Sequence, residues 1–297
     1  MVLILKKRRV CPMRVISLSA SSQSIKYKAE LSLKESQDKA DISKVFHCDG
    51  LLLCTIRESK LVVCNPCLGK TKWIQHYTAR YWNTKCALGY VDNKSCRSYK
   101  ILSYSFKPNN RVDEFGIYEF SSDTWRDLDV DTDDFVMVLE HAVSLKGNVY
   151  WCVKDKTDKF DSVLCFDFRS ERLRRLCFPN FQTRGFNHLS VTREEQLSVL
   201  HRCYAPLQME LWVTNEIDTE AELSWSLPWS LSYLIDEEKK VFVCCIQFNG
   251  HSTKNTLYIF GKDGKRISKM TFGESTYYNQ WWPHIFNYVP SFVQIQQ

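Results

Sequence analysis

The sequence predicts an all-β fold, a propeller-like ring of about five to seven four-stranded antiparallel blades. Two observations lead to this prediction. Short apolar or alternating runs bounded by turn residues recur along the chain, and such runs are typical of β-strands. A hairpin of one pattern also returns about every 50 residues, whereas no amphipathic helix of convincing length is found. The clearest strand-like runs are Gly50 to Ile56, Lys60 to Asn65, Gly147 to Val153, Ser162 to Phe168 and Lys240 to Phe248.

The repeated hairpin consists of an apolar strand that ends in Asn, Asp or Phe, a turn of Gly, Ser, Asp and Lys, and a second strand with a bulky residue. Three clear copies cover residues 62–73, 116–125 and 163–176, and two looser copies cover residues 211–227 and 257–267. The equivalent positions Trp73, Trp125, Arg174, Trp225 and Ile267 are 52, 49, 51 and 42 residues apart. This period is the size of one four-stranded, kelch-like blade, which buries its apolar faces only by stacking on its neighbours.

The amino-terminal region predicts a further, partly formed blade. Its expected strands are Met1 to Leu5, Val10 to Leu18 and Ser24 to Leu33. Because propeller rings usually close by pairing strands from both chain ends, we expect Ile285 to Ile295 to pair with this region. The prediction is therefore a single domain over residues 1–297, in which the basic strands of residues 1–40 contribute to ring closure. Two stacked β-sandwiches are the alternative, although they do not require a repeated hairpin.

Charge and cysteine content narrow the class of protein. Residues 1–40 hold nine Lys or Arg against three acids, so the net charge of +6 resides there and the rest of the chain is neutral. A neutral body does not favour nucleic-acid binding, and Lys6 to Arg9 is either a nuclear-import patch or a solvated turn. Thirteen cysteines without dense spacing are typical of reduced thiols in a cytoplasmic or nuclear protein. Neither a signal peptide nor a membrane span is predicted.

The cysteines include one pair with the spacing of half a zinc site, Cys64 and Cys67. A structural zinc ion needs four ligands, usually as two such pairs, and the sequence holds no second pair. Cys86 and Cys96 could complete the site only through tertiary contact. We therefore predict no metal site.

Two other clusters of reactive side chains have ordinary structural explanations. His47 to Asp49 are expected at the start of a strand, where adjacent side chains point to opposite faces and cannot act together. The acidic run Asp129 to Asp134 partly matches a calcium-binding loop, but Asp134 stands where that loop requires Gly. Nucleophile elbows, phosphate-binding glycine loops and His-Glu-x-x-His helices are missing. The sequence thus predicts a protein that is not an enzyme, with no catalytic, cofactor-binding or metal-binding residues and no cofactor.

A family resemblance runs along the chain in order. The strings at residues 45–54, 61–69 and 73–74 resemble the opening of the F-box-associated domain (type 1) of the large plant F-box protein family. Further agreement is found at residues 87–90, 99–102, 115–125, 142–151 and 287–295. The resemblance implies a β-propeller that presents a target protein to a cullin-based (SCF-type) ubiquitin ligase, while an amino-terminal F-box binds the Skp-type adaptor.

The sequence departs from the family pattern at its start. An F-box would read as helices with leucines at helical spacing, whereas this chain begins with the strand that normally follows them. We therefore expect a protein-binding module for target recognition that does not dock onto the Skp-type adaptor. The alternatives are a propeller enzyme acting on a small molecule and a truncated fragment without function. The target protein and the partner-binding residues are unknown from the sequence.

Overall fold

A computed structural model gives the architecture of the chain, and every element that it describes is a β-strand. No helix among the described residues is long and apolar enough to cross a membrane. The described residues are 2–6, 9–19, 22–27, 33–35, 38–39, 41–56, 60–75, 84–93, 96–106, 112–130, 135–137, 142–155, 161–176, 185–192, 196–203, 209–214, 225–229, 235–236, 241–248, 253–261, 266–275, 284–287 and 291–295.

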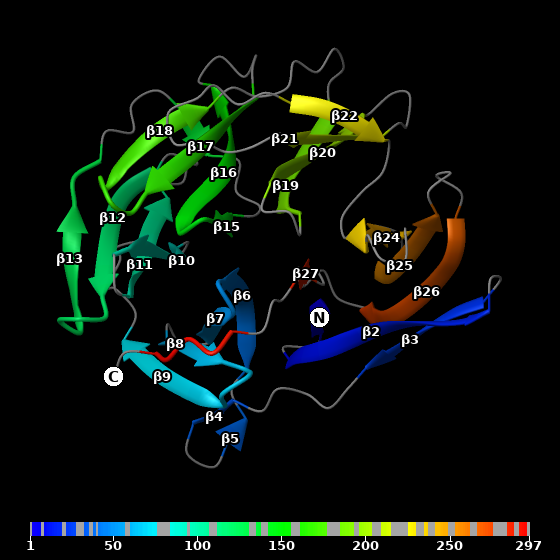
Figure 1. Cartoon of the computed structure of the whole chain (residues 1–297), viewed down its shortest axis with the longest axis horizontal. Helices are drawn as coiled ribbons and strands as arrows, with labels where there is room; N and C mark the ends of the chain where they lie inside the picture. The colour runs from blue at the N-terminus through cyan, green and yellow to red at the C-terminus, as the bar shows by residue number, and fades with distance from the viewer. Residues whose placement is uncertain are drawn as a thin grey trace.

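Six antiparallel sheets of four or five strands follow one another around a common axis (Figure 1). We call them blades I to VI. Blade I holds β1 (Val2–Lys6), β2 (Arg9–Ser19), β3 (Ser22–Tyr27) and β27 (His284–Asn287). Blade II holds β6 (Ile42–Cys48), β7 (Leu51–Ile56), β8 (Lys60–Asn65) and β9 (Lys70–Gln75). Blade III holds β10 (Thr84–Asp92), β11 (Arg97–Phe106), β12 (Val112–Glu119) and β13 (Thr124–Leu128).

The other three blades continue the ring. Blade IV holds β14 (Phe135–Met137), β15 (Val143–Leu145), β16 (Asn148–Asp155), β17 (Asp161–Asp167) and β18 (Arg172–Leu176). Blade V holds β19 (Gly185–Val191), β20 (Leu197–Cys203), β21 (Met209–Thr214) and β22 (Trp225–Trp229). Blade VI holds β23 (Ile235–Asp236), β24 (Val241–Phe248), β25 (Thr253–Gly261) and β26 (Arg266–Ser275), and a small sheet of β4 (Lys34–Glu35) and β5 (Asp38–Lys39) precedes blade II.

This architecture confirms the predicted all-β propeller. The repeated hairpins are the third and fourth strands of successive blades, with Trp73, Trp125, Arg174, Trp225 and Ile267 all on the outermost strand. Of these, Trp125 also ties two blades together, because its Nε1 donates to the carbonyl oxygen of Gln75 at 2.9 Å.

The two chain ends close the ring, but only part of the expected closure is correct. Strand β27 pairs antiparallel with β1, so that Ile285 lies opposite Ile4, as predicted. Residues 291–295 do not extend this pairing; they lie against blade II instead, because Asn65 binds their carbonyl groups. The expected strand Ser24 to Leu33 corresponds to β3 over residues 22–27, whereas residues 28–32 lie outside the described residues and Leu33 is not part of a strand.

The middle strands of a blade bury side chains on both faces. On β7, Leu51 and Leu53 pack toward blade III, whereas Leu52 and Cys54 belong to the core shared with blade I. All four are at most 1% exposed. Successive side chains of a strand point to opposite faces, so a strand buried on both faces needs an unbroken apolar run. The run Leu51 to Cys54 is therefore a direct result of stacking between two neighbours.

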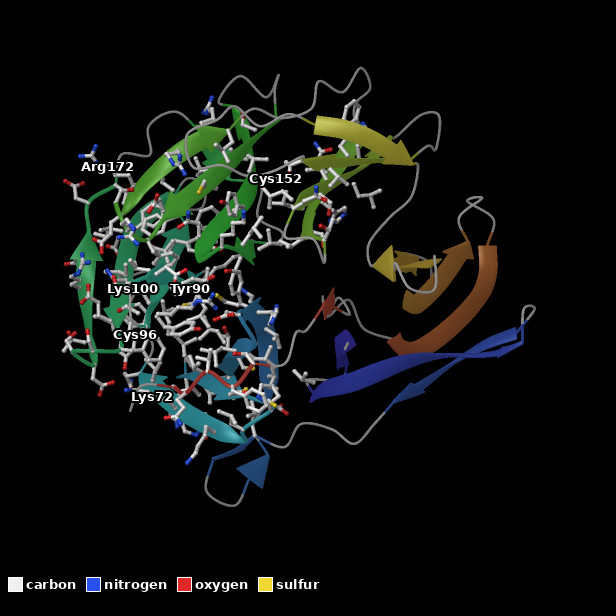
Figure 2. All side chains as sticks on the ribbon, viewed as in Figure 1. Lys72, Tyr90, Cys96, Lys100, Cys152 and Arg172 are labelled. Carbon is white, nitrogen blue, oxygen red and sulfur yellow. The ribbon has the colours of Figure 1, made fainter. Side chains whose placement is uncertain are left out.

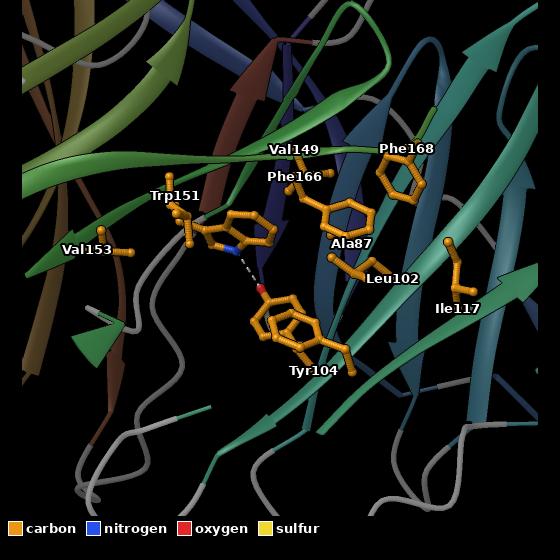
Figure 3. Packing of buried hydrophobic residues seen from close by; sticks show 11 residues of the cluster. Ala87, Leu102, Tyr104, Ile117, Val149, Trp151, Val153, Phe166 and Phe168 are labelled. Carbon is orange, nitrogen blue, oxygen red and sulfur yellow. Dashed lines mark hydrogen bonds between the residues drawn. The ribbon is translucent and has the colours of Figure 1, made fainter. Parts of the chain in front are cut away.

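Side chains fill the seams between neighbouring blades from II to V (Figure 2). The seam between blades III and IV contains five buried aromatic side chains, those of Tyr104, Phe115, Trp151, Phe166 and Phe168 (Figure 3). There the Trp151 indole N–H donates to the Tyr104 hydroxyl at 2.9 Å, and the two rings meet edge to face with centroids 5.5 Å apart. Because the buried indole nitrogen has a partner, this large side chain adds apolar contact without an unsatisfied donor.

Two glycines let the backbones of blades III and IV touch. The Tyr90 N–H donates to the Gly147 carbonyl oxygen at 3.0 Å. A Cβ atom on Gly89 would lie 2.2 Å from Phe168 Cε2 and 2.4 Å from the Gly147 oxygen. Neither the ring, which is fully buried, nor the backbone can move away easily.

We expect Gly89→Ala to lower the free energy of unfolding by about 3 kcal/mol, because the methyl group overpacks this seam. Gly69→Ala is the matched control: its φ is +66°, but a Cβ there meets nothing within 4 Å. The control should lose about 1 kcal/mol, the cost of a left-handed backbone. Urea unfolding of both variants checks this, and equal losses would contradict the close approach.

Candidate functional site

The first and third turns of each antiparallel blade lie on the same side of the ring, which we call the turn rim. Three of its third turns share one geometry, in which the N–H of Gly69, Asp123 or Glu171 donates to the carbonyl oxygen four residues earlier, at 2.9, 2.9 and 2.7 Å. All three residues have positive φ, which costs little for Gly but about 1–2 kcal/mol for the acids. Most of the connections at the opposite side of the ring lie outside the described residues.

Asp123 of blade III, whose backbone is in the left-handed conformation, binds blade II. Lys72 Nζ of blade II lies 2.9 Å from the Asp123 carboxylate, which also accepts a hydrogen bond from the Tyr118 hydroxyl. The hydrogen bond from Tyr118, followed by that from Lys72, lowers the pKa of Asp123. The strained turn therefore positions a carboxylate that bridges two blades.

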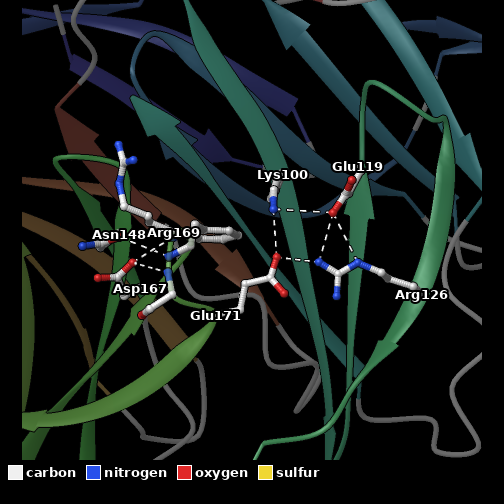
Figure 4. Close-up of polar contacts among 9 residues, drawn as sticks. Lys100, Glu119, Arg126, Asn148, Asp167, Arg169 and Glu171 are labelled. Carbon is white, nitrogen blue, oxygen red and sulfur yellow. Dashed lines mark hydrogen bonds and ion pairs between the residues drawn. The ribbon is translucent and has the colours of Figure 1, made fainter. Parts of the chain in front are cut away.

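Glu171 of blade IV forms the same kind of bridge to blade III (Figure 4). Its carboxylate lies 2.8 Å from Lys100 Nζ and 2.5 Å from Arg126 Nη2. Glu119 joins the network at 3.0 Å from Arg126 Nη2 and 3.5 Å from Lys100 Nζ. Burial tends to raise the pKa of Glu171, but the hydrogen bonds from Arg126 and Lys100 outweigh it and lower the pKa. The four charges balance, so this part of the rim presents no free charge to a ligand.

Asp49, at the first turn of blade II, binds blade III in a similar way. Its carboxylate lies 2.6 Å from Arg97 Nη1 and accepts a hydrogen bond from the Tyr99 hydroxyl. The Arg97 guanidinium also lies over the Tyr90 ring, 4.6 Å from the centroid. The cation and the two phenols come from β10 and β11, so blades II and III are joined at this turn by ionic and aromatic contacts.

The neighbours of Asp49 have different partners, which corrects one prediction. His47 and Cys48 end strand β6 rather than begin it, and Asp49 lies in the following turn. His47 Nε2 accepts a hydrogen bond from the Gly50 N–H at 3.2 Å, and the Ser144 hydroxyl donates to Cys48 Sγ at 3.1 Å. Burial raises the pKa of the Cys48 thiol to about 12, so it is not a ready nucleophile.

The four cysteines considered for zinc are not brought together as one set. Cys64 is buried in the core shared by blades I and II, whereas Cys67 and Cys96 are exposed. Burial raises the pKa of Cys86 to about 12. In the described part of the chain, no group of three or more His, Cys, Asp or Glu side chains could hold a metal ion. Within the acidic run, residues 131–134 lie outside the described residues.

Asn65 is a buried anchor residue that the sequence did not single out. It is 0% exposed, and its amide uses both ends. Nδ2 donates to the carbonyl oxygens of Ser291 and Val293 at 2.9 and 2.8 Å. Oδ1 accepts from the N–H groups of Cys67 and Leu68 at 2.8 and 3.2 Å. The turn of blade II therefore fixes the amide that holds residues 291–295, which we call the terminal segment.

The terminal segment alternates between partly buried and exposed side chains. Val293 and Ile295 are partly buried and pack against the core between blades II and III, whereas Phe292 and Gln294 are exposed. Phe292 is 83% exposed, and the segment crosses blade II toward blade III in Figure 1. The sequence prediction for Ile285 to Ile295 rested on ring closure and placed these residues with the amino-terminal strands, so it did not include a contact with blade II.

We expect Glu171→Gln to lower the free energy of unfolding by about 1 kcal/mol at low salt, because Lys100 and Arg126 lose an ionised partner. Asp129→Asn, which is exposed just after β13, serves as the control and should change stability by less than about 0.5 kcal/mol. The measurement is urea unfolding at low and at molar salt. A Glu171→Gln loss that is unchanged by salt would contradict the ionic bridge.

A second prediction concerns pH. Burial lowers the pKa of His47 to about 4, from about 6.5 in an unfolded chain, so the folded protein binds this proton less well than the unfolded chain does. Stability from neutral His47 is fully present above pH 6.5 and is lost as pH falls toward 4. Between pH 7 and 5 the wild type should lose about 2 kcal/mol more than His47→Gln, measured by urea unfolding. Identical pH profiles would contradict this assignment.

Comparison with known proteins agrees with the fold. The family model described as F-box associated beta propeller domain matches residues 1–295. A protein of Arabidopsis thaliana bearing the name F-box/kelch-repeat protein is 44% identical over 317 aligned residues, which cover 100% of this chain and 84% of the relative. A second Arabidopsis relative, named F-box only protein 9, is 42% identical and covers 100% of this chain and 82% of its own length. Among solved structures, a lectin of Aleuria aurantia is 12% identical with a TM-score of 0.37 and covers 77% of this chain and 76% of its own. The family model and the close relatives together show that this chain belongs to the F-box associated beta propeller domain family.

Proposed function

We propose that this protein recognises a target protein for an SCF-type ubiquitin ligase and acts in the cytoplasm or nucleus. The observation that carries the proposal is the match of the F-box associated family over residues 1–295, with relatives named as F-box proteins. The F-box family implies a target-binding role, and we propose that this chain fulfils that role without chemistry of its own. Among the described residues, no group of three or more His, Cys, Asp or Glu side chains could hold a metal ion for the enzyme alternative.

The turn rim supports a binding role through its rigidity. Its acids at positive φ and the cations of neighbouring blades hold successive turns together, as at Asp123 and Glu171. A surface that is ordered before binding loses less conformational entropy when a partner docks. The ring therefore supplies a fixed frame on which a target can be recognised.

Adaptor binding is a separate matter for the 297-residue chain on its own. The family match occupies residues 1–295, and every described element is a strand. Adaptor docking in the F-box family is expected to use helices. We therefore propose that this chain, taken alone, binds its target but not the Skp-type adaptor.

A fusion experiment tests both parts. The chain is expressed in plant cells alone and with the F-box of a relative attached at its amino terminus, and bound proteins are identified by mass spectrometry. We expect both baits to retain the same target proteins, the fusion alone to retain the adaptor, and target abundance to fall only with the fusion. A second family propeller with the same F-box is the matched control.

Two outcomes would contradict the proposal. If both baits retain only chaperones, or only proteins that the control propeller also retains, target recognition is wrong. If the chain alone retains the purified Skp-type adaptor, the statement on docking is wrong.

A further inference from the structure

The terminal segment is held by contacts that do not depend on its exact sequence. Asn65 binds two backbone carbonyl groups, those of residues 291 and 293, rather than side chains. The other contacts that hold the segment are apolar. They come from Val293 and Ile295, two aliphatic side chains spaced two residues apart on the side that faces the core. Any extended peptide with this alternation offers the same two carbonyls and the same apolar face.

The site on blades II and III is built independently of the segment. The Asn65 amide is fixed by the N–H groups of Cys67 and Leu68, within its own turn. The apolar floor is the cluster against which Val293 and Ile295 pack, and strands of both blades contribute to this cluster, with members that include Leu61, Ile74 and Tyr118. When the segment leaves, the Asn65 Nδ2 group loses two hydrogen-bond acceptors and the apolar floor is exposed to water. Binding of another extended peptide in the empty site is therefore favourable.

The segment itself is only lightly attached. Among the described residues, 291–295 pair with no strand, so they lack the ladder of hydrogen bonds that holds β27 on β1. The Val293 N–H is satisfied within the segment by the Ser291 hydroxyl at 3.1 Å. The segment can therefore leave as a unit without breaking a sheet.

We propose that the seam between blades II and III is a binding site for an extended peptide segment with aliphatic residues at alternate positions. Residues 291–295 occupy it in the free protein, and a segment of the same pattern from the target exchanges with them. This inference rests on the proposed target-recognition function and names the kind of segment recognised. Main-chain hydrogen bonds supply the affinity, and the two apolar contacts supply the selectivity.

The test uses the full chain carrying Val293→Asp and Ile295→Asp, which removes the segment from the site by making its burial unfavourable. A fluorescent peptide with the sequence of residues 287–297 is the probe, and its anisotropy is the readout. We expect the peptide to bind the double variant at least about tenfold more tightly than the wild type, whose own segment competes.

Matched probes separate the site from nonspecific binding. A peptide with the same two Asp substitutions should not bind, whereas a Phe292→Ser peptide should bind as well as the natural one, because Phe292 points to solvent. Adding Asn65→Ala to the double variant should weaken peptide binding, with folding checked by circular dichroism. Equal binding of all three peptides, or no binding to the double variant, would overturn the proposal.

A second measurement does not depend on the double variant being folded. An isotope-labelled peptide in excess over the wild-type protein should speed hydrogen exchange of the Val293 amide, which mass spectrometry follows. If the hydrogen-exchange rate of the Val293 amide is unchanged at saturating peptide, the peptide does not replace the terminal segment at the seam and the proposal is wrong. Neither result involves the target, so a failure here is distinct from a failure to capture target proteins.

Discussion

Burial of the middle strands on both faces is the constraint on which this fold depends. Leu51 and Leu53 belong to one core and Leu52 and Cys54 to the next, although all four lie in a row on β7. A four-stranded sheet with two apolar faces is unstable in water on its own, because the hydrophobic effect scales with the apolar area that remains exposed. Each blade therefore needs both neighbours, and the chain ends must meet, as β1 and β27 do.

The polar contacts of the turn rim follow from this stacking. Once the apolar seams bring the blades together, the turns of neighbouring blades lie within reach, and Asp49, Asp123 and Glu171 each bind a cation of an adjacent blade. Their positive φ values are tolerated because these ionic contacts offset part of the backbone cost. The charged groups thus hold neighbouring blades together, and the proposed exchange with a partner is placed instead at the terminal segment on Asn65.

The repeat of bulky residues from Trp73 to Ile267 was sufficient to predict the blades, because each hairpin has to solve the same burial problem. The pairing of Ile285 with the amino-terminal strand followed from ring closure. Local patterns could not place residues 291–295 on blade II, because their alternation fits any half-buried extended segment and the deciding contact is an Asn65 side chain 226 positions away from Ser291. The ionic bridges were also out of reach, since they join residues of different blades.

Native-state hydrogen exchange of the Leu53→Ala variant tests the stacking account most directly. The substitution removes buried contacts from the seam between blades II and III, at a cost of about 2–5 kcal/mol. If the blades depend on each other, the slow amides of β7 and of β11, including that of Ile101, should lose similar amounts of protection. Loss of protection confined to blade II, with β11 unchanged, would show that the blades are stable independently and would contradict the account.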